Sequence, residues 1–289
     1  MTYPINTLSK IFNKLGTVFI FLGIVLIYMR FYHHRTSHIS NPLSFNFLKN
    51  VKPEHQQYCI NFITNNVTES QFEQDLFLYK NFFYKHSAEG LNGFYIDSGA
   101  NDARRLSNTF FLDVCLGWDG LCIEPMPEYH EDLKRSRSCK LVPECISTGE
   151  KQVNLAGSGA TARVVDGDGT TKCSSLPDIL EKYANGRRKI DFWSIDMEGY
   201  ELKVLSSLDF NDIDVKLMLI EDFFVSIRQL DLLLTRNGYV KFHELAIDSV
   251  FVKRGIELPP NVWYPPHYDE NIRLNREYRE SVKEQLTCV

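Results

Sequence analysis

Short apolar runs alternate with amphipathic segments between Ser70 and Lys253, and the last two runs are separated by only a few residues. Such alternation is typical of α/β folds, in which helices connect neighbouring parallel strands. The last two runs, 239–245 and 249–253, are too close for a parallel crossover, which needs a dozen or more residues. The sequence therefore predicts a Rossmann-like α/β domain over residues 70–254, with a mostly parallel sheet and a closing antiparallel hairpin.

The individual elements are predicted from the period of the apolar residues, which is two in strands and 3.6 in helices. Strands are expected at 93–97, 121–124, 140–147, 151–155, 190–196, 216–221, 239–245 and 249–253. Helices are expected at 71–84, 104–116, 128–138, 176–184, 198–208 and 226–236. The glycine-rich segment 157–171 is expected to be a loop, and its length is typical of loops with a function. The charged tail at 255–289 is expected to end in a surface helix.

The N-terminal segment before Glu54 contains no Asp or Glu, although it contains several Lys and Arg residues. Within it, residues 15–29 are uncharged and almost entirely apolar. As a helix this run is about 22 Å long, and the long basic side chains on either side can extend it across a bilayer. We predict a transmembrane signal-anchor helix at 15–32, after a short tail at 1–14 and before a stem at 33–69.

Two other targeting segments would explain the same composition. A cleaved signal peptide also has basic residues before an apolar core, but residues 30–35 offer no small-residue cleavage site. A mitochondrial presequence also lacks acidic residues, but it is amphipathic rather than apolar on all sides. The uncleaved anchor is therefore the preferred interpretation.

The compartment is predicted from one glycosylation sequon, Asn66-Val67-Thr68, which is usable only if the domain that follows is luminal. Basic residues flank the apolar run on both sides, so the positive-inside rule gives little guidance. We expect a single-pass protein of the Golgi or endoplasmic reticulum with a luminal domain. In such a lumen Cys139 and Cys145 could pair, and buried free thiols are the alternative. The net charge of −5 argues against a nucleic-acid partner.

Acidic residues end two of the predicted strands. Asp97 ends the strand 93–97, within the segment YIDSGAND, and Glu124 ends the strand 121–124. In open α/β sheets, ligands bind at the carboxyl ends of the strands. There Asp97 suits an ammonium group, Gly99 lets the backbone approach a ligand, and Glu124 suits a ribose diol. The alternative is that each is an ordinary residue of a strand–turn–helix connection.

The loop after the first strand fits an adenosine cofactor better than a dinucleotide. Dinucleotide-binding loops carry the pattern G-x-G-x-x-G, whose backbone amides hold the pyrophosphate. This loop has only Gly99 and is acidic. An NAD-dependent oxidoreductase is therefore disfavoured.

The segment 191–201, DFWSIDMEGYE, brings two further acids, Asp196 and Glu198, to the same edge of the sheet. Paired carboxylates in this position can act as a general base, hold a divalent metal ion, or orient a hydroxyl substrate. Glu201 is expected in the first turn of the next helix and could be only a helix-start acid. His243, near the end of a late strand, could be a base near neutral pH or a structural histidine.

Four segments that occur in this order, YIDSGAND, SNTFFLDVCLGWDGLCIEP, DFWSIDMEGYELKVL and LMLIED, closely resemble the FkbM-type S-adenosylmethionine-dependent methyltransferases. The resemblance extends from about residue 70 to about residue 253. It implies a class I methyltransferase fold, S-adenosylmethionine as the cofactor, and methylation of a hydroxyl, often on a sugar or polyketide. Ser98 and Ala103 depart from the family, which often has an aliphatic residue and a glycine at these positions.

The resemblance also implies roles for residues of this chain. Four of them are expected to line the cofactor: Asp97, Gly99, Asn101 and Glu124. Asp196 and Glu198 are expected beside the transferred methyl group. We assign the general base to Asp196 or Glu198, with His243 as the third candidate, and we assign no metal ligand.

The function expected from these residues is methyl transfer from S-adenosylmethionine to a hydroxyl-bearing acceptor, a glycan or a small molecule. Some membrane-tethered eukaryotic members of the family act in protein trafficking with no established methyl transfer. A non-catalytic, membrane-tethered domain of the secretory pathway is therefore the alternative. The acids expected around one pocket favour the enzyme, because a scaffold does not need them.

Overall fold

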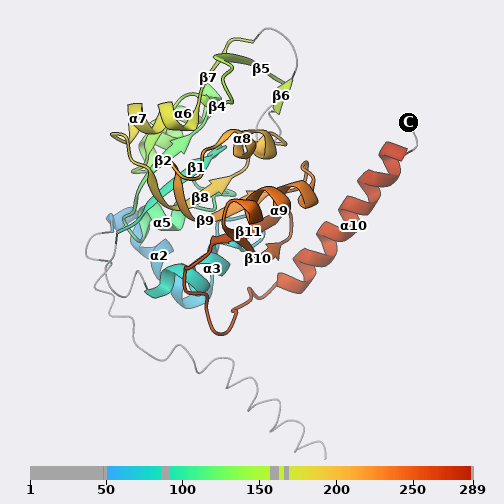
Figure 1. Ribbon diagram of the computed structural model, residues 1–289. Coiled ribbons are helices and arrows are strands. Elements are labelled where there is room, and N and C mark those ends of the chain that lie inside the picture. Colours follow the sequence, from blue (N-terminus) through green and yellow to red (C-terminus); the bar gives the residue numbers. More distant parts are fainter. Residues whose placement is uncertain (1–47, 49–50, 86–91, 157–162, 166–168, 288–289) are drawn as a thin grey trace, which may run out of the picture. The chain divides into compact units, whose positions relative to one another are not determined.

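The computed structural model describes residues 48, 51–85, 92–156, 163–165 and 169–287 (Figure 1). Within these residues no helix combines the length and the apolar character needed to cross a membrane. The predicted signal-anchor at 15–32 and the tail at 1–14 lie outside the described residues, so both stay predictions.

In the described part of the chain, the main sheet has seven strands in the order β10-β11-β9-β8-β1-β2-β3 (Figure 1). In this order the strands are β10 (Tyr239–Leu245), β11 (Asp248–Lys253), β9 (Asp214–Glu221), β8 (Lys189–Ile195), β1 (Phe94–Ser98), β2 (Asp119–Ile123) and β3 (Lys140–Val142). Neighbours from β9 to β3 pair in parallel, whereas β11 pairs antiparallel with both β9 and β10. The predicted mostly parallel sheet with a closing hairpin is confirmed, and the second strand of the hairpin lies inside the sheet.

Helices cover both faces of this sheet because the strand side chains alternate between two apolar cores. In β8, Trp193 belongs to the first core and Phe192 to the second, and both are fully buried. The helices that contribute to the first core are α7 (Leu176–Tyr183), α8 (Glu201–Ser207) and α9 (Ile227–Arg236). Those that contribute to the second are α2 (Pro53–Asn65), α3 (Gln74–Leu78), the π-helical turn η2 (Tyr79–Phe83) and α5 (Phe110–Val114). The domain is therefore a three-layer α/β/α structure.

Among the residues that the structure describes, two further helices contribute no fully buried residue to these two cores. Helix α6 (Pro127–Ser136) buries Leu133 against Cys122 of β2 in a third, smaller cluster. Helix α10 (Tyr268–Thr287) forms in the C-terminal tail, where a surface helix was expected. The side chain of Asn275 in α10 donates a hydrogen bond to the backbone oxygen of Ala246, so this part of α10 lies beside the turn of the hairpin.

A second sheet of four strands carries the chain between β3 and α7. Its order is β4 (Cys145–Ile146), β7 (Thr171–Ser174), β5 (Gln152–Ala156) and β6 (Arg163–Val165). The strand predicted at 140–147 is broken at Pro143, which has no N–H to continue the ladder, so β3 and β4 join different sheets. The loop predicted at 157–171 was wrong in part, because β6 and the start of β7 fall within it.

Helix α2 occupies residues that the sequence analysis assigned to the stem at 33–69. Its buried face packs into the second core, where Phe62 stacks on Phe111 of α5 with ring centroids 3.7 Å apart. A disulfide between Cys59 and Cys115 joins α2 to the end of α5. The structure therefore places residues 53–65 in the folded unit.

The cysteines pair differently from the expectation that Cys139 and Cys145 could be partners. Cys139 pairs with Cys122, and Cys145 pairs with Cys173 across the two parallel strands of the small sheet. The suggested Cys139–Cys145 bond was wrong, because Cys139 precedes β3 and is bonded to Cys122 of β2, whereas Cys145 lies in β4 of the small sheet.

The helix predicted at 104–116 is much shorter, since only α5 forms there. Before it, the Asp102 carboxylate accepts the N–H groups of the residues two and three positions later, at 2.9 and 2.7 Å. The Ser107 hydroxyl accepts the N–H of Phe110 at 3.1 Å. These side chains hold the backbone in turns that compete with a helix, and Leu106 has a left-handed φ of +66°. The result is a loop over 101–109 beside the strand ends.

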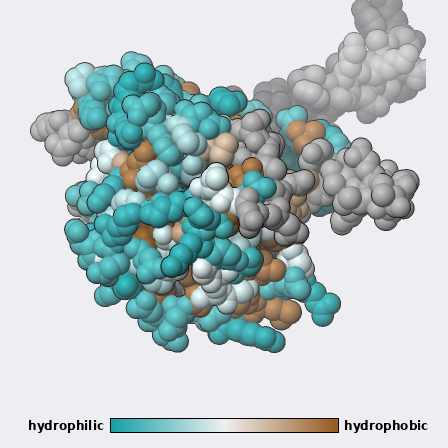
Figure 2. Space-filling model, turned by 90° about the horizontal axis from the view of Figure 1, so that it is seen from above, coloured by the Kyte–Doolittle hydropathy of each residue, from teal (hydrophilic) through white to brown (hydrophobic). Residues whose placement is uncertain are grey.

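The surface seen from above is covered mostly by hydrophilic residues, and hydrophobic residues show in small patches between them (Figure 2). Exposed large apolar side chains include Phe224, which is 52% exposed. Phe224 also lines the cavity of the candidate functional site.

Candidate functional site

The register of the parallel strands brings several chain segments to one edge of the main sheet. Ser98, the last residue of β1, is paired with Ile123 of β2 and with Ile195 of β8. Strands β8 and β9 also end level with each other. The residues that end or follow these strands therefore lie along one edge: Gly99, Glu124, Asp196 and Glu221.

A cavity of about 540 Å³ lies at this edge, within the roughly 300–1,000 Å³ that is usual for small-molecule sites. It is lined by six of the seven residues that the sequence singled out, namely Asp97, Gly99, Asn101, Glu124, Asp196 and Glu198. The predicted cofactor residues and the predicted acceptor residues thus share one space. Their individual roles stay predictions.

Gly99 is required by its contact with the neighbouring strand. Its φ is +79°, and a Cβ built on it would lie 1.9 Å from the backbone oxygen of Asp196. The backbone N–H of Asp196 in turn donates to the backbone oxygen of Ser98 at 3.0 Å. The sequence analysis expected the missing side chain to make room for a ligand, whereas here it makes room for the turn after β8. The loop after β1 and the turn after β8 therefore fix each other.

The carboxylate of Glu124 is held by the backbone. Its Oε2 accepts the N–H of Asn101 at 2.7 Å, and its Oε1 accepts the N–H of Met126 at 2.8 Å. Asn101 has a φ of +48°, a conformation that asparagine tolerates better than most residues. Burial raises the pKa of Glu124 to about 7, although both N–H groups oppose this shift. Glu124 is therefore a fixed acceptor whose charge changes near neutral pH.

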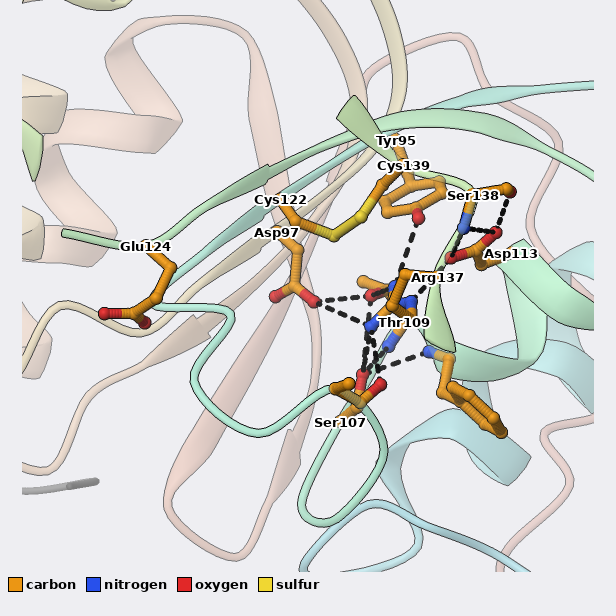
Figure 3. Close-up of a disulfide and its surroundings, with 12 residues drawn as sticks. Tyr95, Asp97, Ser107, Thr109, Asp113, Cys122, Glu124, Arg137, Ser138 and Cys139 are labelled. Carbon is orange, nitrogen blue, oxygen red and sulfur yellow. Dashed lines mark hydrogen bonds and ion pairs between the residues drawn. A yellow bond between two sulfur atoms is a disulfide. The ribbon is translucent and has the colours of Figure 1, made fainter. Parts of the chain in front are cut away.

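Asp97 belongs to a buried polar network around Arg137 (Figure 3). Its Oδ2 accepts a hydrogen bond from the Thr109 hydroxyl at 2.5 Å and lies 3.8 Å from Nη1 of Arg137. The fully buried Arg137 also donates through Nε to Asp113 at 2.5 Å and through Nη2 to the Tyr95 hydroxyl at 3.1 Å. Burial raises the pKa of Asp97, while Arg137 opposes this shift.

The second carboxylate oxygen of Asp97 points away from Arg137 in Figure 3, and Asp97 lines the cavity. One side of this carboxylate is thus bound inside the protein. The predicted role of Asp97, to bind a cationic group of a ligand, stays a prediction.

The turn after β8 contains two successive residues with left-handed backbones, Glu198 at φ +53° and Gly199 at φ +97°. The helix predicted from residue 198 therefore begins later, at Glu201. Glu201 folds back over the turn, since its Oε1 accepts the N–H of Met197 at 2.6 Å and that of Gly199 at 3.1 Å. This carboxylate closes the turn that carries Asp196 and Glu198 to the cavity.

Asp196 lies close to a further acid, Glu221 at the end of β9. Burial, followed by the negative charge of Glu198, raises the pKa of Asp196 to about 7. Burial, followed by the charges of Asp196 and Glu201, raises the pKa of Glu221 well above its ordinary value. A carboxylate with a pKa near neutral is suited to accept a proton from a substrate.

His243 lies apart from this cavity, which it does not line. Its ring stacks on Phe77, with centroids 5.5 Å apart, and its Nε2 is 2.6 Å from the Tyr268 hydroxyl. Burial lowers the pKa of His243. His243 therefore packs among aromatic side chains away from the other candidates, and its role as the third candidate base stays a prediction.

Three residues of the site were missed from the sequence. Glu221 closes the segment LMLIED, so its position at a strand end was a usable signal. Arg137 lies one residue past α6 (Pro127–Ser136) in a stretch of charged residues that looks like a solvent-facing helix. Thr109 lies where a helix was predicted. Nothing in the local sequence marks Arg137 or Thr109, because their partners come from other elements.

A parallel sheet that ends in an antiparallel hairpin, with a cavity at the carboxyl ends of its strands, defines a methyltransferase-like α/β domain. Residues 97–241 match the family described as the Methyltransferase FkbM domain, and this match covers half of the chain. The chain belongs to this family, whose members generally use S-adenosylmethionine.

Two solved structures are similar to the chain at low identity. The methyltransferase FkbM from Methylobacillus flagellatus KT is 13% identical, with a TM-score of 0.34, over 73% of this chain and 58% of that one. Monomeric WbdD is 10% identical, with a TM-score of 0.33, over 80% of this chain and 50% of that one. The chain thus spans about half the length of these structures. No curated protein sequence matches the chain.

Proposed function

We propose that this protein transfers a methyl group from S-adenosylmethionine to a hydroxyl group of a glycan or small molecule. The observation that carries the proposal is one cavity at the carboxyl ends of the strands, which residues on both sides of β1 line together. It places Glu124 toward one side of β1 and the pair Asp196 and Glu198 toward the other.

The residues present fit this cofactor. Glu124 offers a fixed carboxylate to the two hydroxyls of a ribose, and hydrogen bonds to a charged acceptor are stronger than neutral ones. The outer oxygen of Asp97 suits an ammonium group. When bound, S-adenosylmethionine supplies a methyl group that is attached to a positively charged sulfur. The bond between the methyl carbon and the sulfur breaks during transfer, and the sulfur becomes part of a neutral thioether. An acidic cavity suits that positive charge.

The acceptor is expected on the side of β8 and β9. There the carboxylate of Asp196 or Glu198 accepts the proton of the acceptor hydroxyl while the hydroxyl oxygen forms its bond to the methyl carbon. Tyr200 and Phe224 line the same cavity, and Phe224 stands partly exposed. Flat aromatic side chains beside a few polar groups are usual in small-molecule sites.

A luminal, membrane-anchored location is part of this proposal. Three disulfides support an oxidising compartment, where such bonds persist. The sequon residue Asn66 lies at the C-terminal end of α2 and is only partly buried, which is compatible with a glycan. A shift in mobility after glycosidase treatment of the full chain, made in a secretory system, tests the topology.

The deciding experiment is calorimetry of the full chain with S-adenosylmethionine, with NAD as the comparison ligand. Binding of the first and not the second supports the proposal. A folded protein that binds neither ligand contradicts it and leaves the trafficking domain as the better interpretation. Methyl transfer from labelled cofactor to a panel of glycans and alcohols then identifies the acceptor class.

A further inference from the structure

Three carboxylates from three chain segments converge beside the cavity. One oxygen from each of Asp196, Glu201 and Glu221 lies within 4.8 Å of an oxygen from each of the others. Asp196 follows β8, Glu201 begins α8, and Glu221 ends β9. This set differs from the pair that the sequence suggested, since Glu201 and Glu221 replace Glu198.

The cluster is buried and incompletely paired. Glu201 is 0% exposed and Glu221 is 6% exposed, yet Oε2 of each has no hydrogen-bond partner. In the part of the chain that the structure describes, no Lys, Arg or His side chain forms an ion pair with these three residues. Buried charges are normally paired or coordinate a metal ion, because an isolated buried carboxylate is costly.

Protonation alone does not give every carboxyl group of the cluster a hydrogen-bond partner. One proton shared between Asp196 and Glu221 would link that pair, but it would leave Oε2 of Glu201 without a partner. Oε1 of Glu201 already accepts hydrogen bonds from both backbone N–H groups of the turn, those of Met197 and Gly199. These two donors are therefore not available to Oε2 of Glu201. A cation at the centre would satisfy all three side chains together.

We propose that Asp196, Glu201 and Glu221 form a binding site for a hard divalent cation. Carboxylate oxygens are the ligands that Ca²⁺, Mg²⁺ and Mn²⁺ prefer. With bonds of about 2.3–2.6 Å, two ligands of a Ca²⁺ ion lie at most roughly 5 Å apart, so the observed separation needs little change. A Mg²⁺ ion, at about 2.1 Å, would need the ligands to close somewhat.

The cavity gives a cation access to the cluster, and it would let a bound cation contact the methyl acceptor. Asp196 and Glu221 line the cavity, whereas Glu201 lies behind them, so a bound ion would keep an open face toward the cavity. An acceptor hydroxyl on that face would lose its proton more readily, with Glu198 beside it as the proton acceptor. This role rests on the proposed function, but the binding of the cation does not.

The test is direct binding of Mn²⁺ to the full chain. Binding is measured from the electron paramagnetic resonance signal of Mn²⁺ and by calorimetry, with Ca²⁺ and Mg²⁺ as competitors. We expect one site, displaced by Ca²⁺. Glu221→Gln and Asp196→Asn should each weaken Mn²⁺ binding at least tenfold. Glu124→Gln is the matched control, because it removes a buried acid at the same sheet edge outside the cluster, and it should bind Mn²⁺ normally.

The outcomes separate this inference from the proposed function. A folded wild-type chain that binds no Mn²⁺ at millimolar concentration overturns the cation site, and so does binding that survives in both cluster variants. If Mn²⁺ binds but S-adenosylmethionine does not, the cation site stands and the methyltransferase proposal fails. If a cluster variant does not fold, the wild-type measurement and the other variant still decide.

Discussion

Gly99 follows β1 and Asp196 follows β8, and the backbone oxygen of Asp196 occupies the space that a side chain at position 99 would need. This contact couples the loop predicted to bind the cofactor to the turn predicted to bind the acceptor. A change at Gly99 should therefore disturb both sides of the cavity.

Gly99→Ala should destabilise the domain by more than its left-handed φ alone would. A non-glycine residue in that conformation costs about 1 kcal/mol, and the 1.9 Å contact with backbone must also be relieved, for a total of roughly 2–4 kcal/mol. Gly117→Ala is the control, since Gly117 has φ +65° with nothing within 4 Å of the added Cβ. Urea unfolding should show a clear excess for Gly99→Ala. Equal losses in the two variants would mean that the contact with Asp196 is not tight.

Arg137→Met should be strongly destabilising, because it leaves Asp97 and Asp113 buried without their cation. Removing one partner of a buried ion pair typically costs about 3–5 kcal/mol. Arg135→Met is the control two residues earlier, where the ion pair with Asp132 is mostly exposed and worth about 1 kcal/mol or less. Thermal unfolding of both variants measures the difference. Similar melting temperatures would show that the buried network contributes little.

The affinity for S-adenosylmethionine should depend on pH through Glu124. If the ribose needs the charged carboxylate and its pKa is about 7, binding should strengthen roughly tenfold between pH 6 and pH 8. Glu124→Gln should flatten this profile and weaken binding at pH 8 by about 1.5–3 kcal/mol. Calorimetry at several pH values measures both effects. A wild-type profile that is already flat would place the ribose elsewhere.

The carboxyl group of Glu124 also affects the stability of the ligand-free protein. Here a rise in pH weakens its contribution, whereas a rise in pH strengthens the binding of the cofactor. The pKa of Glu124 is higher in the folded chain than its ordinary value of 4.5, so the folded state holds the proton more tightly. Its contribution to the free energy of unfolding is therefore fully present below about pH 4.5 and is lost as the pH rises through about 7. Glu124→Gln should remove this decline, which denaturant titrations at pH 5 and pH 8 can measure.

The disulfides should stabilise the domain unequally. The Cys59–Cys115 bond spans 56 residues and the Cys122–Cys139 bond spans 17. In the chain-entropy description these loops are worth about 4 and about 3 kcal/mol. Replacing both cysteines of the first pair with alanine should therefore lower stability more than the same change in the second pair. The reverse order would indicate that contacts near Glu124, rather than loop length, dominate.

How far the sequence predicted the structure depended on whether a pattern was local. Strands β1, β2 and β8 were recognised because each contains a short apolar run that stops at an acid, which lies within one residue of the end of the strand. The closing hairpin followed from its short turn alone. These features need only the period of the apolar residues and the length of a connection.

Features that depend on distant partners could not be predicted in this way. In the sequence, Arg137 follows a run of charged residues typical of an exposed helix face, and only the fold brings Asp97, Asp113 and Tyr95 around it. The loop before α5 looked helical because the turns formed by Asp102 compete with a helix that the apolar pattern favours. The partner of each cysteine likewise depends on sheet order, which spacing does not reveal.

The last prediction separates an enzyme from a scaffold at Asp196 and Glu198. Both line the cavity, and Glu198 occupies a left-handed position that glutamine can adopt as readily as glutamate. Asp196→Asn and Glu198→Gln should therefore remain folded, with melting temperatures close to that of the wild type. Methyl transfer to the true acceptor should fall by at least ~10²-fold in the variant that loses the general base, while affinity for S-adenosylmethionine stays nearly unchanged. Glu181→Gln, at an exposed and remote carboxylate, should keep full activity. If either cavity variant unfolds, that carboxylate is structural; if both stay folded and fully active, the base lies elsewhere and its assignment to this pair fails.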